Sequence, residues 1–111
     1  MNSTVYVFAS PNGRFNTAGA VTFGQVRYCS PEGRVSMFNT DAGMAFIEER
    51  LEDFDPDTDF IAMTGQNVIV ALALSYVMAK FGRCRILLFD ARTAKYAERT
   101  VHHPSFSREV E

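Results

Sequence analysis

Four small or polar residues interrupt the most apolar part of this 111-residue sequence. They are Thr64, Gly65, Gln66 and Asn67. The run before them, FIAM, has the composition of a buried strand, and the run after them, VIVALALSYVMA, is long enough for a helix. The four residues would then open a helix, where free backbone N–H groups and the helix dipole attract anions. This segment is the first candidate for a site that binds a phosphate- or carboxylate-bearing molecule.

Further polar side chains would reach the same place if their strands run parallel to FIAM. Asp90 and Arg92 come at the end of the apolar strand RCRILLF. Ser10, Asn12 and Arg14 follow the strand TVYVFA. The carboxyl ends of parallel strands share one edge of a sheet, and ligands of open α/β sheets gather there. We therefore expect hydroxyl, amide, carboxylate and guanidinium groups from three segments to line one cleft.

A purely structural role is the alternative for the four residues. Thr64 or Asn67 can cap the helix, and Gly65 can supply backbone freedom to the turn. The longer phosphate-binding fingerprints, GxGxxG and the glycine–lysine P-loop pattern, do not occur here.

If the segment does bind a ligand, two classes of function remain. A non-catalytic binding or accessory protein, viral or regulatory, would need only the anion site. A small enzyme acting on a phosphorylated or nucleotide-like compound would use Asp90 as acid or base, with Arg14 and Arg92 as anion clamps. We favour the binding protein, because no second catalytic group accompanies Asp90.

Metal, cofactor and thiol chemistry are not expected. Adjacent residues on an extended chain point to opposite sides, so His102 and His103 would chelate a metal poorly. Cys29 and Cys84 are too few for a disulfide framework in so short a chain, and we expect both to be reduced, structural thiols.

The elements that must position these residues form an α/β pattern. Alternating or continuous apolar runs predict strands, and apolar residues at helical spacing predict helices. The predicted strands are 4–9, 20–29, 34–38, 59–63, 83–90 and 95–101, and the predicted helices are 41–54 and 66–82. The order is β-β-β-α-β-α-β-β in a single domain, residues 1–101, followed by a flexible tail over 102–111.

We expect a mixed sheet covered by helices. The first three strands would form an antiparallel meander, and the segments from 59 to 90 a parallel, right-handed βαβ unit. The residues expected to be nearly fully buried are Ile69, Leu72, Val77, Leu87 and Phe89. The element order resembles that of ribonuclease-H-like folds, with a Rossmann-like topology as the alternative. Ribonuclease H chemistry needs clustered carboxylates that hold metal ions. The strand TVYVFAS contains no acidic residue, so we do not expect nuclease activity.

The helix predicted over 66–82 is apolar nearly all round, so the sheet alone cannot cover it. Ala71, Ser75 and Ala79 form a stripe of small residues at intervals of four. Either the helix over 41–54 or a second subunit must cover the remaining face. We expect a homodimer, with two-fold packing.

Charge is distributed unevenly along the chain. Residues 41–59 hold eight acids and one base, and residues 80–99 hold six bases and two acids. Two solvated faces are the simplest interpretation, and a protein partner on the acidic face is the alternative. The net charge of −2 argues against nucleic acid as the ligand.

Composition places the chain among ordinary globular proteins, with 47% hydrophobic and 22% charged residues. The N-terminus lacks the pattern of a signal peptide, and the longest apolar run is shorter than the roughly 20 residues that span a membrane. We therefore expect a soluble protein of the cytoplasm.

Overall fold

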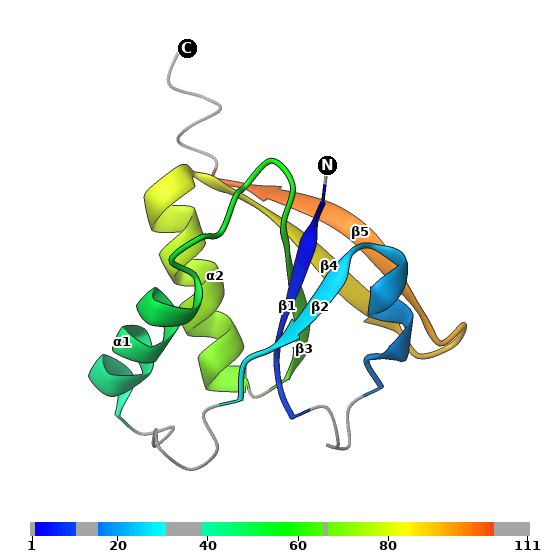
Figure 1. Ribbon diagram of the computed structural model, residues 1–111, viewed down its shortest axis with the longest axis horizontal. Coiled ribbons are helices and arrows are strands. Elements are labelled where there is room, and N and C mark those ends of the chain that lie inside the picture. Colours follow the sequence, from blue (N-terminus) through cyan, green and yellow to red (C-terminus); the bar gives the residue numbers. More distant parts are fainter. Residues whose placement is uncertain (1, 11–15, 31–38, 66, 104–111) are drawn as a thin grey trace.

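A computed structural model describes residues 2–10, 16–30, 39–65 and 67–103. Five strands form one sheet in the order β2-β1-β3-β4-β5, with two α-helices on one face (Figure 1). The strands are β1 (Thr4–Phe8), β2 (Gln25–Tyr28), β3 (Phe60–Gly65), β4 (Arg83–Asp90) and β5 (Lys95–His102). The helices are α1 (Thr40–Arg50), α2 (Asn67–Phe81) and the short 3-10 helix η1 (Ala18–Thr22).

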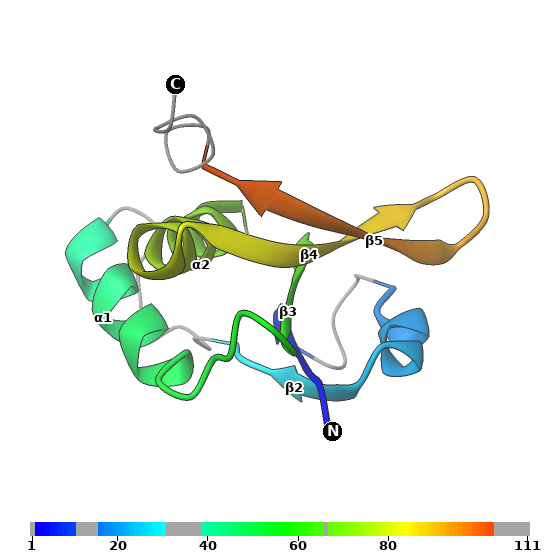
Figure 2. The same ribbon diagram turned by 90° about the horizontal axis from the view of Figure 1, so that it is seen from above.

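The direction of the chain crossovers decides which face each helix covers. Strands β1 to β4 are parallel, and β5 is antiparallel to β4. The chain steps from β1 to β2 in one direction, then returns past β1 to β3 and continues to β4. Right-handed crossovers in opposite directions lie on opposite faces of a sheet. Accordingly, η1 packs on one face, and α1 and α2 lie together on the other (Figure 2).

The α/β class, the mixed sheet and the parallel βαβ unit are confirmed. The antiparallel pairing expected for the first two strands is wrong, because β1 and β2 are parallel, with Val5 opposite Val26 and Val7 opposite Tyr28. The observed order is the doubly wound one, so the Rossmann-like alternative describes this sheet better than the ribonuclease-H-like one. The expected strand over 34–38 lies outside the described residues.

The single long strand expected over 20–29 is also wrong. Its first part forms η1, which gives the chain the crossover that a parallel neighbour requires. Gly24, with φ of +157°, then brings the chain against β1, where the Gln25 N–H donates to the Ser3 carbonyl at 2.9 Å. Any side chain at Gly24 would collide with that carbonyl.

The helix ends follow local signals. Asn39 caps α1, because its side-chain carbonyl accepts a hydrogen bond from the Ala42 N–H at 3.0 Å. α2 ends at Phe81, and Gly82 follows it with a φ of +77°, a conformation that favours glycine. The Gly82 carbonyl accepts from the His103 N–H, so the end of β5 is tied to the end of α2.

The core has two parts, one on each side of the sheet. β1 contributes to both, with Tyr6 and Phe8 on the helix side and Val5 and Val7 on the η1 side. The burial expected for Ile69, Val77 and Leu87 is confirmed. Leu72 and Phe89 are only partly buried, which corrects the expectation for them. Leu72 packs at the margin of the helix-side cluster, and Phe89 rests edge-on against Tyr96 near the end of the β4–β5 hairpin.

Several charges of the acidic segment are used to fix the loop before β3. The buried Asp59 carboxylate accepts hydrogen bonds from the Thr4 N–H, the Asp55 N–H and the Thr58 hydroxyl, at 2.9 to 3.0 Å. The Asp57 carboxylate pairs with Arg83. The acidic and basic segments of the sequence therefore neutralise each other in part within the chain.

The interior position of β4, between β3 and β5, leads to a first prediction. Leu87→Ala should lower the free energy of unfolding by about 2–5 kcal/mol, because the Leu87 side chain is fully buried. Its neighbour Leu88, 42% exposed, is the matched control, and Leu88→Ala should cost about 1 kcal/mol or less. Urea denaturation of the two variants measures the difference. Equal losses in the two variants would mean that Leu87 is not buried in the interior of the sheet.

Candidate functional site

The strand order reverses between β1 and β3, and α2 begins at that point. In doubly wound sheets, ligands bind outside the carboxyl ends of the strands where the order reverses. Figure 1 shows the carboxyl ends of β1 and β3 and the start of α2 at one edge of the molecule. Thr64 and Gly65 end β3, and Asn67, which is exposed, is the first residue of α2. This edge is the candidate binding site.

Gly65 has a structural role at this edge. It pairs with Phe8 across β1 and β3 and has a φ of +150°, which side-chain-bearing residues rarely adopt. A Cβ atom at Gly65 would lie 2.5 Å from the Phe8 carbonyl oxygen and 3.3 Å from Val70 Cγ2. The glycine therefore lets β1, β3 and the first turn of α2 approach one another.

The Thr64 side chain contacts the hydroxyl of Tyr96, a residue of β5. The Tyr96 hydroxyl donates to the Asn16 carbonyl at 2.9 Å, and its oxygen lies 3.3 Å from Thr64 Oγ1. The contact links β5, β3 and the segment before η1. Since Tyr96 and η1 pack on the face opposite α2, the Thr64 side chain points away from the helix that it was expected to cap. Residue spacing does not predict this link, because Tyr96 occupies an ordinary position in a strand whose side chains alternate between the two faces.

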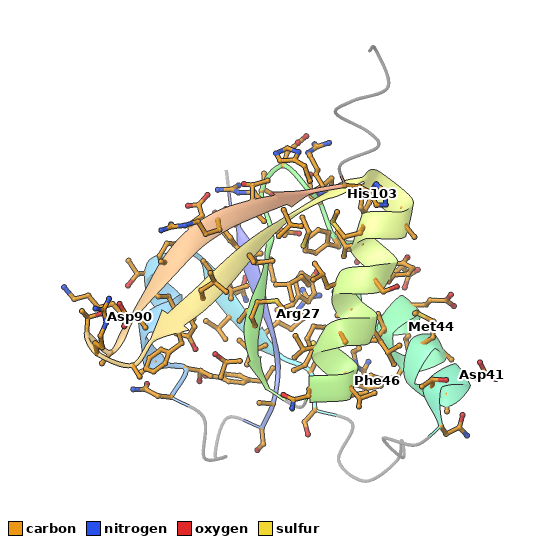
Figure 3. The ribbon with its side chains drawn as sticks, turned by 180° about the vertical axis from the view of Figure 1, so that it is seen from behind. Arg27, Asp41, Met44, Phe46, Asp90 and His103 are labelled. Carbon is orange, nitrogen blue, oxygen red and sulfur yellow. The ribbon has the colours of Figure 1, made fainter. Side chains whose placement is uncertain are left out.

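Asp90 and Arg92 lie in the turn of the β4–β5 hairpin. The Asp90 carboxylate accepts a hydrogen bond from the Arg92 N–H at 3.0 Å and two from its guanidinium at 3.3 Å. These bonds lower the pKa of Asp90. Figure 3 shows Asp90 at the far end of the hairpin, away from α2. The structure therefore does not bring this pair to the start of α2, and Asn12, Arg14 and Gln66 lie outside the described residues.

Thiol and metal chemistry find no support in the described part of the chain. Cys29 and Cys84 are free and buried, and burial raises the pKa of Cys29 to about 11 and that of Cys84 to about 12. Among the described residues, no three His, Cys, Asp or Glu side chains are grouped to hold a metal ion. His102 and His103 are exposed at the end of β5. No described helix combines the length and apolar character needed to cross a membrane.

These features define a small α/β protein with a doubly wound sheet. Its candidate site is the edge where the strand order reverses, and the described residues show no catalytic constellation there. Residues 3–103 match the family described as Phage Pam3 gp32-like protein, and the chain belongs to that family. No curated protein and no solved structure matches the chain. The family description links the chain to bacteriophages and names no activity.

The buried thiols lead to a second prediction. At pH 8, both thiols of the native protein should stay protonated and shielded, because their pKa values lie well above that pH. Ellman's reagent should therefore detect almost no thiol in the native protein and both thiols after denaturation in guanidinium chloride. Rapid labelling of one cysteine in the native protein would contradict its burial.

The close approach at Gly65 leads to a third prediction. Gly65→Ala should lower the free energy of unfolding by about 1–3 kcal/mol, from the unfavourable φ and the collision with the Phe8 carbonyl. Gly19→Ala is the control, since a Cβ there meets its nearest atom at an ordinary 3.5 Å. Thermal denaturation compares the two variants. A Gly65→Ala variant as stable as Gly19→Ala would show that β1 and β3 do not need a glycine here.

Proposed function

We propose that this member of a phage protein family is a non-catalytic accessory protein of the cytoplasm that binds a small anion at the carboxyl ends of β1 and β3. The single observation that carries the proposal is the reversal of strand order at the point where α2 begins. Two features support the same edge: ligands of doubly wound sheets bind where the strand order reverses, and the start of a helix attracts negative charge.

The first turn of α2 would supply the main contacts. The first N–H groups of an α-helix have no partner within the helix and can donate to a phosphate oxygen. Asn67 adds an exposed side-chain amide. Gln66, Asn12 and Arg14 remain proposed contacts. Arg14 takes the role of the cation in this proposal, because Arg92 is engaged with Asp90 at the hairpin.

Anion binding at the carboxyl ends of β1 and β3 is better supported than catalysis by Asp90. A general acid or base at neutral pH needs a carboxyl whose pKa is raised towards 7. The pKa of Asp90 is shifted in the opposite direction by Arg92, and the pair lies away from α2 (Figure 3). The ligand class that fits is a phosphate, a pyrophosphate or the phosphate group of a nucleotide.

Two protein contacts belong to the same proposal. The exposed acids of α1 and the turn after it favour a protein partner on the acidic face. The exposed positions of Ala71, Ser75 and Ala79 favour a homodimer through α2, because α1 leaves that face of the helix open. Nucleic acid is not proposed as the ligand, given the net charge of −2.

Titration of the isotope-labelled protein with phosphate, pyrophosphate and common nucleotides tests the anion site. The amide resonances of Gly65, Asn67 and Val68 should shift with at least one of them, because their N–H groups lie at the proposed site. Asn67→Asp should weaken binding at least about tenfold, since it adds like charge with little change of shape.

Gln25→Glu is the matched control for that variant. It adds the same single charge at an exposed position on β2 and should bind the anion like the original protein. If none of the three amides shifts with any anion, or if Asn67→Asp binds as well as Gln25→Glu, the segment is only a turn into a helix.

A further inference from the structure

We draw no further inference here: the strongest candidate, the exposed side of α2 that carries Ala71, Ser75 and Ala79, is an unpartnered helix face, and nothing in the described part of the chain shows what covers it.

Discussion

The contact between β1 and β3 is the constraint on which the rest of the structure depends. The side chains from Val5 to Phe8 are almost completely buried, so β1 is packed on both faces and paired on both edges. At its carboxyl end, the Phe8 carbonyl lies so close to Gly65 that a Cβ atom there would collide with it. Because β1 has β2 on one edge and β3 on the other, the chain leaves it on one side to form β2 and returns past it to form β3.

This change of direction, from β2 back past β1 to β3, determines where the other features lie. It sends η1 to one face and α1 and α2 to the other, since right-handed crossovers in opposite directions lie on opposite faces. It opens the edge where α2 begins, which is the proposed anion site. The position of the proposed anion site is thus a consequence of one topological step.

The elements could largely be predicted from the sequence, but the pairing of the first two strands could not. Buried strands such as β3 and β4 have continuous apolar runs that mark them directly. Alternation in β2 is the same whether its neighbour is parallel or antiparallel, so the sequence pattern does not distinguish the two. The deciding features are the 3-10 turn of η1 and the unusual φ of Gly24. A glycine inside an apolar run indicates a bend, but it does not indicate in which direction the next strand runs.

The candidate site was predicted in part for a similar reason. The edge where α2 begins follows from the βαβ pattern, which is local in sequence. The positions of Asp90 and Arg92 depend on how far the β4–β5 hairpin extends beyond its neighbours, which is set by the three-dimensional arrangement of the sheet. The Tyr96 link to Thr64 joins residues 32 positions apart, and the buried Asp59 binds Thr4 across 55. Such contacts leave no trace in residue spacing.

Nuclear Overhauser contacts between backbone protons of β1 and its neighbours test the central claim most directly. The account predicts that Val5 contacts both Val26 and Phe60, and that Val7 contacts Tyr28, as parallel pairing on both sides requires. If Val5 instead lies beside Tyr28 and Val7 beside Val26, the first two strands are antiparallel. The parallel crossover from β1 to β2 would then be absent, and with it the argument that the carboxyl ends of β1 and β3 form the binding edge of a doubly wound sheet.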